Sequence, residues 1–151
     1  MEEIIQLNSG AKLSPHFTLG EMTKSSSHPE VYNIPSHEAI ANMKRVCEWL
    51  EVLRLRAGTP IRINSGYRSP QLNKAIHGVA GSNHMTGCAS DIRVENMEQL
   101  IRYAAILLDY AKESKQEFDE LLIERNSHGA IWLHFAVRPS GNRHKVAFIN
   151  A

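Results

Sequence analysis

The sequence predicts one α+β domain built on a mainly antiparallel sheet. The expected elements run helix, strand, helix, strand, helix and then three strands, an order typical of this class. The length of 151 residues suits a single domain with a real core, and a hydrophobic content of 42% is typical of a globular protein. No internal repeat interrupts the chain, so we expect residues 1–151 to form one domain whose helices cover one face of the sheet.

The first third of the chain combines an arm with a long helix. Residues 1–35 carry few periodic apolar positions, so we expect an extended N-terminal arm with one short helical turn. From Ser36 to about Ala57, apolar side chains recur every three or four positions, which predicts an amphipathic helix. Gly58 then ends this helix, because glycine is the residue most often found just past a helix C-terminus.

Shorter elements fill the rest of the chain. Ser69 and Pro70 mark the start of a second helix, because serine caps helices and proline suits the first helical position. Asn96 and Gln99 form a capping-box-like start for a long helix that runs to about Lys115. Apolar runs predict strands near residues 61–63, 91–94, 118–124, 131–137 and 144–149.

The most informative motif contains candidate metal ligands. The pattern S-x-H-x-x-G-x-A-x-D runs from Ser82 to Asp91, and Trp132 and His134 follow in a strand-like segment far downstream. His84, Asp91 and His134 supply two imidazoles and one carboxylate, a ligand set suited to zinc. Three protein ligands leave the fourth tetrahedral position open, where a water ionises near neutral pH. The sequence therefore predicts metal-assisted hydrolysis with one zinc ion as cofactor.

Further segments, together with this motif, carry a family resemblance. They are F-T-L-G-E-M at 17–22, I-N-S-G-Y-R-S at 63–69, L-N at 72–73, F-D-E-L-L at 118–122, W-L-H at 132–134 and G-N-R at 141–143. Over most of its length the chain resembles the zinc D-alanyl-D-alanine carboxypeptidases, which share their fold with hedgehog signalling domains. It is most similar to the small single-domain members common in bacteriophages and prophages.

This resemblance implies a hedgehog-like fold and a zinc metallopeptidase whose metal is bound by His84, Asp91 and His134. Its implied substrates are peptidoglycan stem peptides, and a phage-type endolysin is one form that the function would take. The wider family contains carboxypeptidases and murein endopeptidases that cut different bonds, so the bond cut here stays open.

Three other residues are candidates for substrate binding. The resemblance assigns Arg68 to a substrate carboxylate or carbonyl, a role that a planar guanidinium suits; the alternative is that it pairs with a local acid. Ser82 either donates a hydrogen bond to the substrate or caps its own loop. Trp132 shares strand parity with His134, so it is expected to form a wall of the cleft, the core or both.

The general base is not obvious from the motif. Many relatives carry an acid three residues before the last ligand histidine, where this chain has Ile131. Glu124 is the first candidate to replace that acid, because a hairpin between the strands near 120 and 134 would bring it across from about Ile131. His128, in the turn before the ligand strand, is the second candidate.

Two alternatives to a zinc enzyme are open. The absence of an acid at Ile131 favours a non-catalytic, zinc-stabilised module that binds cell wall or a partner protein. Cys88 lies inside the motif, so a second alternative is a cysteine hydrolase that would use Cys88 with His84, although this leaves Asp91 and His134 unexplained. The more ordinary role for Cys88 is that of an inert small residue.

Charge, cysteine content and hydrophobicity along the chain indicate which partners and which cellular location to expect. A net charge of +1 gives no support for nucleic-acid binding, and two cysteines are too few for a disulfide framework. The acidic start has no secretion-signal pattern and no apolar run is long enough for a membrane span, so we expect no membrane partner. We expect a protein that is cytoplasmic as synthesised and that reaches the cell wall during lysis. The oligomeric state stays open.

Overall fold

The computed structural model describes residues 10–25 and 27–151. In this part of the chain, five strands form one sheet in the order β3-β4-β6-β5-β7. All neighbours in the sheet are antiparallel except β5 and β7, which run parallel. The strands are β1 (Lys12–Ser14), β2 (Phe17–Thr18), β3 (Ile63–Ser65), β4 (Ala89–Arg93), β5 (Glu120–Arg125), β6 (Ile131–Ala136) and β7 (Lys145–Asn150).

The helices agree closely with the sequence expectations. They are α1 (Leu19–Thr23), α2 (His37–Ala57), α3 (Pro70–Ala75), α4 (Met97–Ser114) and the short 3-10 helix η1 (Asn83–Thr86). The side chains of Ser36, Ser69 and Asn96 accept N-cap hydrogen bonds from the backbone, as the pattern predicts. Gly58 ends α2 with a φ of 70°, the left-handed conformation that glycine adopts without strain. The α+β class with a mostly antiparallel sheet is confirmed.

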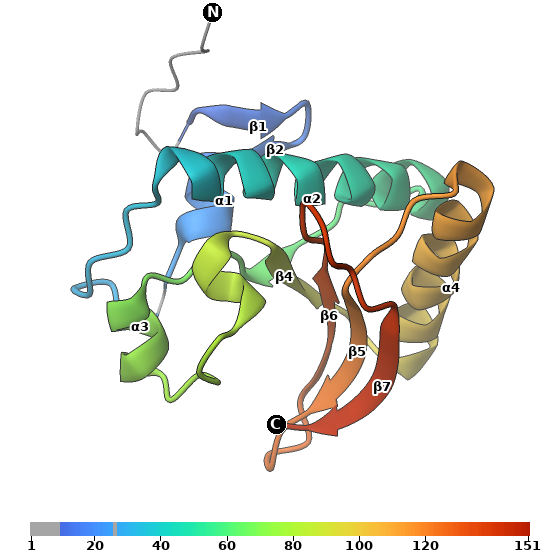
Figure 1. Cartoon of the computed structure of the whole chain (residues 1–151). Coiled ribbons are helices and arrows are strands. Elements are labelled where there is room, and N and C mark those ends of the chain that lie inside the picture. The colour runs from blue at the N-terminus through green and yellow to red at the C-terminus, as the bar shows by residue number, and fades with distance from the viewer. Residues whose placement is uncertain (1–9, 26) are drawn as a thin grey trace, which may run out of the picture.

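The two faces of the sheet differ in character. Ile92, Leu133 and Phe135 are fully buried and belong to the core formed with α2 and α4. Because side chains alternate along a strand, Asp91 and His134 point to the opposite face. Figure 1 shows α2 and α4 packed along the curved sheet, while β5, β6 and β7 leave one side uncovered by helices. The candidate ligands therefore lie on the face opposite the helices.

The N-terminal segment is more structured than an extended arm. Strands β1 and β2 form a hairpin, and Phe17 and Met22 are buried in the main core. The carbonyl of Met22 accepts a hydrogen bond from the backbone N–H of Tyr67 at 2.6 Å, so α1 supports the loop that carries Arg68. Residues 1–9, on which the expectation about a secretion signal depends, lie outside the described residues, as does Ser26.

Within the described ranges, no helix combines the length and the apolar character that a membrane crossing needs.

Candidate metal centre

Three different elements bring the candidate ligands together. His84 lies in η1, Asp91 lies in β4, and His134 lies in β6 directly opposite Asp91 in the strand register. Gly87 connects η1 to β4 with a φ of 78°, and a Cβ at this position would collide with the carbonyl of Ala39 in α2. The glycine of the motif therefore makes the turn that returns the chain from His84 to Asp91.

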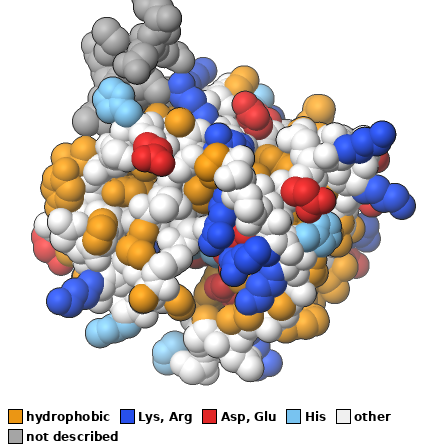
Figure 2. Space-filling view, viewed as in Figure 1, with side chains coloured by type: hydrophobic (Ala, Val, Ile, Leu, Met, Phe, Trp, Pro, Cys, Tyr) orange, Lys and Arg blue, Asp and Glu red, His pale blue; other side chains and the backbone are white. Residues whose placement is uncertain are grey.

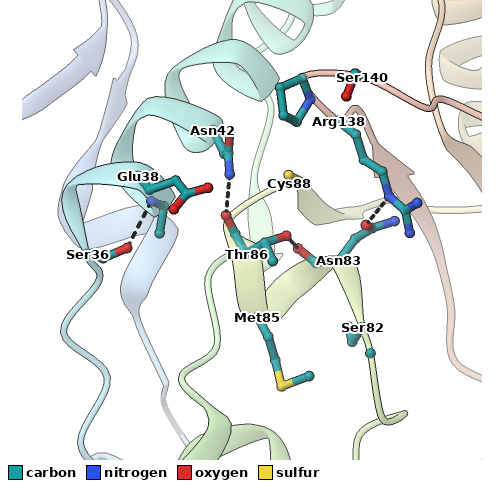
Figure 3. A pocket seen from close by; sticks show the side chains of 13 residues that line it. Ser36, Glu38, Asn42, Ser82, Asn83, Met85, Thr86, Cys88, Arg138 and Ser140 are labelled. Atoms are coloured by element: carbon teal, nitrogen blue, oxygen red, sulfur yellow. Dashed lines mark hydrogen bonds between the residues drawn. The ribbon is translucent and has the colours of Figure 1, made fainter.

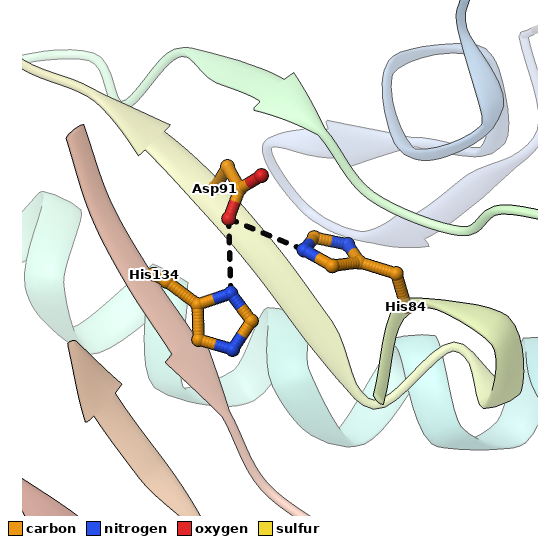
Figure 4. A group of neighbouring side chains, drawn as sticks. All are labelled: His84, Asp91 and His134. Atoms are coloured by element: carbon orange, nitrogen blue, oxygen red, sulfur yellow. Dashed lines mark hydrogen bonds and ion pairs between the residues drawn. The ribbon is translucent and has the colours of Figure 1, made fainter. Parts of the chain in front are cut away.

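The three side chains converge on one point (Figure 4). The Oδ1 atom of Asp91 lies 3.2 Å from Nε2 of His84 and 3.0 Å from Nδ1 of His134. One ligand atom from each residue lies within 4.8 Å of the other two, and all three residues are buried. Two imidazoles and a carboxylate at this spacing could hold a metal ion.

The outer hydrogen bonds of the histidines orient them for metal binding. Nδ1 of His84 lies 2.6 Å from the carbonyl of Gly66, and Nε2 of His134 lies 3.0 Å from Oε1 of Glu120. Both partners only accept, so these nitrogens donate, and the other ring nitrogen of each residue faces Asp91. A ligand histidine typically donates its second N–H to a carbonyl or carboxylate in this way. The donor set therefore fits a divalent metal.

The charges of the triad are strongly coupled. Burial opposes a charge on His134, but hydrogen bonds to Asp91 and Glu120 outweigh it and raise the pKa of His134 to about 10. Burial likewise opposes a charge on Asp91, yet the charge of His84 and the hydrogen bond from His134 hold the pKa of this carboxyl well below its usual range. A metal that binds here replaces a proton on His134.

Arg68 lies beside the triad and contacts it. Its guanidinium is 3.3 Å from Oδ2 of Asp91, the carboxylate oxygen turned away from the histidines. It also donates to Ser65 at 3.1 Å and to Asn73 at 3.3 Å. Arg68 therefore does pair with a local acid, and that acid is a candidate metal ligand.

Glu120 is a site residue that the sequence reasoning missed. It lies on β5, where it contacts His134 and accepts a hydrogen bond from Asn83 at 2.6 Å. The hydrogen bond from His134 is the main reason why the pKa of Glu120 is lowered. The alternation of side chains along β5 was the available signal. Leu122 pairs with His134, and Glu120 and Glu124, two residues before and after Leu122, point to the same face of the sheet as His134.

We expect the E120Q substitution to weaken zinc binding by roughly 10- to 100-fold, the usual effect of losing an outer-shell carboxylate. Glutamine still accepts a hydrogen bond from His134 but does not provide the negative charge. Competition titration against a zinc chelator measures the affinity. The matched control is E117Q, because Glu117 is exposed and pairs only with His144 among the described residues. Equal zinc affinities in E120Q and wild type would contradict the role of Glu120.

Glu124 also lies beside the triad, in a register one residue away from the one expected. It pairs with Trp132, whereas Ile131 pairs with Arg125. This register puts Glu124 on the same face as His134, with Oε1 4.0 Å from Nδ1 of His134. Burial and the nearby charge of Asp91 raise the pKa of Glu124, which brings the carboxylate closer to the range useful for a base at neutral pH.

His128 lies away from the triad. It is exposed in the turn between β5 and β6, where the side chain of Asn126 accepts its backbone N–H at 3.0 Å. It does not line the cavity that contains the triad. Of the two residues considered for proton transfer, the structure brings only Glu124 next to the candidate ligands.

The triad opens into a cavity of about 740 Å³. Arg68, Ser82 and Trp132, the candidate substrate-binding residues, all line it. Ser82 also caps η1 by accepting a hydrogen bond from the backbone N–H of His84 at 3.1 Å. The indole N–H of Trp132 is buried and makes no normal hydrogen bond to any residue in the described ranges, although Glu124 is its cross-strand neighbour.

A second cavity of about 480 Å³ lies between the start of α2 and η1 (Figure 3). It shares Gly81, Ser82, Asn83 and Arg138 with the first cavity but contains none of the candidate ligands. Cys88 lines this second cavity and not the cavity that contains the triad, and burial raises the pKa of its thiol. Both observations disfavour a thiolate nucleophile that acts with His84.

Asp119 organises the charged groups between the two cavities. It is fully buried and accepts hydrogen bonds from Arg143, through Nε at 3.0 Å and a terminal nitrogen at 2.8 Å. Asn83 donates to it at 2.8 Å, and Nε of Arg138 lies 3.2 Å away. Burial opposes the charge of Asp119, but these partners outweigh it and lower its pKa to about 2.

The lowered pKa of Asp119 predicts that this residue makes a pH-dependent contribution to the free energy of unfolding. Because the folded pKa is below the unfolded value, the contribution is complete above about pH 4 and is lost as the pH falls through about 2. Its size is on the order of 2 kcal/mol. We expect the difference in unfolding free energy between wild type and D119N to shrink by this amount from pH 6 to pH 2 in urea titrations. The exposed Asp109 provides the control D109N. A difference that does not change with pH would contradict the expectation.

Comparison with protein families agrees with this geometry. The family model described as Peptidase M15 matches residues 15–128, which is more than half of the chain. The match includes His84, Asp91 and Glu124 and ends before His134. No curated protein matches the sequence.

Proposed function

Because the chain belongs to the peptidase M15 family, we propose that it is a zinc-dependent peptidase acting on the stem peptides of bacterial peptidoglycan. The observation that carries the proposal is the buried triad of His84, Asp91 and His134 at the floor of an open cavity. A D-Ala-D-Ala carboxypeptidase or a murein endopeptidase would use the same site. We further propose a phage-type endolysin as its biological setting.

In this proposal His84, Asp91 and His134 hold the metal. When bound, zinc supplies a Lewis acid for the scissile carbonyl and an activated water. Arg68 and Asp91 stay paired through the second carboxylate oxygen, which fixes the orientation of the ligand. Arg68, Ser82 and Trp132 line the cavity and position the peptide.

Glu124 is the proposed general base. Its side chain is mostly buried in the cavity, its pKa is raised by burial and by Asp91, and it lies beside His134. These features suit a group that takes a proton from the attacking water and gives it to the leaving amine. Glu120, whose pKa is lowered and which is engaged by His134, suits the positioning role instead. His128 is the second candidate for the base.

Ile131 favours the alternative function, a zinc-stabilised binding module without turnover. Its side chain packs against the hydrophobic core and has no proton to transfer. The position of Glu124 supports the enzyme, because a carboxylate from the neighbouring strand reaches the face that Ile131 does not.

Mass spectrometry of purified muropeptides separates the two functions. Zinc-loaded protein is incubated with the muropeptides beside a chelator-treated sample. We expect a zinc-dependent loss of mass, and the fragment identifies the bond that is cut. Intact muropeptides after incubation with protein that holds one zinc per chain would overturn the peptidase and favour the binding module.

A further inference from the structure

We propose that the cavity accepts an anionic peptide and that Arg138 and Arg143 hold one of its carboxylates at the rim. The inference deepens the proposed function, on which it rests, by naming a charge on the substrate. Arg68, at the floor of the cavity, was the only cation assigned to the substrate from the sequence. Arg138 and Arg143 form a second cationic site, which we call the rim pair.

Charges in the cavity are separated by depth. The carboxylates of Asp91, Glu120 and Glu124 have side chains that are only 10–15% exposed. Arg138 and Arg143 also line the cavity, but their side chains are 34% and 50% exposed. Figure 2 shows Lys and Arg side chains gathered near the middle of this face, beside a hollow in which acidic side chains are visible. A ligand that enters the cavity therefore meets cations first.

The rim pair is held in place by Asp119 beneath it. Arg143 binds both oxygens of this buried carboxylate, and Arg138 binds it through Nε. Nε of Arg138 also donates to Asn83 at 2.9 Å. Nη2 of Arg143 also lies 3.4 Å from Glu120. Among the described residues, no hydrogen bond engages either terminal nitrogen of Arg138 or the Nη1 atom of Arg143. The guanidiniums are thus fixed by one edge, and their other donors are left for a ligand.

A carboxylate is the ligand that this arrangement suits. A guanidinium presents parallel N–H donors that match a carboxylate, and little entropy is lost when its side chain is already fixed. Asp119 pairs with both guanidiniums, and a terminal nitrogen of Arg143 also lies 3.4 Å from Oε2 of Glu120. Arg138 is the more available of the two, because Asp119 is its only carboxylate partner among the described residues. Lys145, exposed at the same rim, adds to the positive potential that attracts an anionic peptide.

Calorimetric titration of stem peptides tests the rim pair without depending on turnover. The titrations use three forms of a stem pentapeptide. The first is the free acid, the second has its internal carboxylate converted to a carboxamide, and the third has its C-terminal carboxylate converted to a carboxamide. The protein is the zinc-loaded E124Q variant, alone and with R138K, R143K or R102K added. Lysine keeps a positive charge against Asp119, so the fold is maintained while the fork is lost. Arg102 is exposed on α4 and pairs with Glu98, which makes R102K the matched control.

We expect one of the two amidations to weaken binding by about 10- to 100-fold, the usual effect of losing a hydrogen bond to a charged group. The ratio of the Kd of the amidated peptide to the Kd of the free acid should fall close to one in R138K or R143K, and it should be unchanged in R102K. Equal binding of all three peptides, or no binding at all, would overturn the inference. A ratio that survives in both R138K and R143K would also overturn it and would assign the carboxylate to Arg68. Failure of the muropeptide assay alone affects the proposed function and not this result.

Discussion

Replacing His134 with alanine is expected to reduce zinc-dependent hydrolysis to the level of the chelated control. Alanine removes one of the three ligand atoms, and it leaves Asp91 and Glu120 without the imidazole that each contacts at 3.0 Å. Zinc should then no longer bind tightly, so the increase in melting temperature that zinc gives the wild type should also disappear. Activity assays and thermal melts with and without added zinc measure both effects.

Two further variants make this result specific to the triad. H84A removes the other imidazole and should cause the same loss, which guards against a folding defect particular to His134. H37A replaces an exposed histidine at the start of α2, outside the cavity, and should behave as wild type. Full activity of H134A in a zinc-loaded assay would remove His134 from the ligand set.

The second large effect is expected from the E124Q substitution. Glutamine has nearly the shape of glutamate but cannot take a proton, so kcat should fall by roughly 10²- to 10⁴-fold. Zinc affinity should be nearly unchanged, because Glu124 lies 4.0 Å from His134 and is not part of the triad. Kinetics on a muropeptide substrate, combined with a zinc titration of the same samples, separates the loss of a base from the loss of metal.

The H128A variant tests the competing hypothesis that His128 is the general base. If Glu124 is the base, H128A should retain activity close to that of wild type, because His128 lies in an exposed turn outside the cavity. Nearly normal turnover by E124Q together with a large loss in H128A would transfer the proton-moving role to His128. This outcome would also require the turn between β5 and β6 to approach the triad during catalysis.

The helices could be predicted well from sequence because their signals are local. Ser36, Ser69 and Asn96 act as the N-caps of α2, α3 and α4. The periodic apolar residues that follow each cap predict the buried face of the helix. The N-terminal hairpin was missed because β1 and β2 have three and two residues, too few for an alternation to be recognised. The parallel pairing of β5 with β7 depends on tertiary contacts that no local pattern encodes.

The grouping of His84, Asp91 and His134 could be predicted because these residue types and their spacing are distinctive. The positions of the carboxylates around this candidate metal site depend on strand register. A shift of one residue places Glu124 opposite Trp132 instead of Ile131 and therefore on the face of the triad. Glu120 lies two residues from the partner of His134, a relation that exists only once β5 and β6 are aligned. The Asp119 cluster likewise joins Asn83, from η1, to Arg138 and Arg143, from the connection between β6 and β7.

X-ray absorption at the zinc edge of the zinc-loaded protein tests the central claim, that His84, Asp91 and His134 hold a catalytic type of zinc. We expect one zinc per chain with nitrogen and oxygen neighbours at about 2.0–2.2 Å, including the outer-ring scattering of two imidazoles. A sulfur neighbour at about 2.3 Å would instead indicate ligation by a cysteine. Either that sulfur signal, or a protein that retains no zinc, would contradict the account.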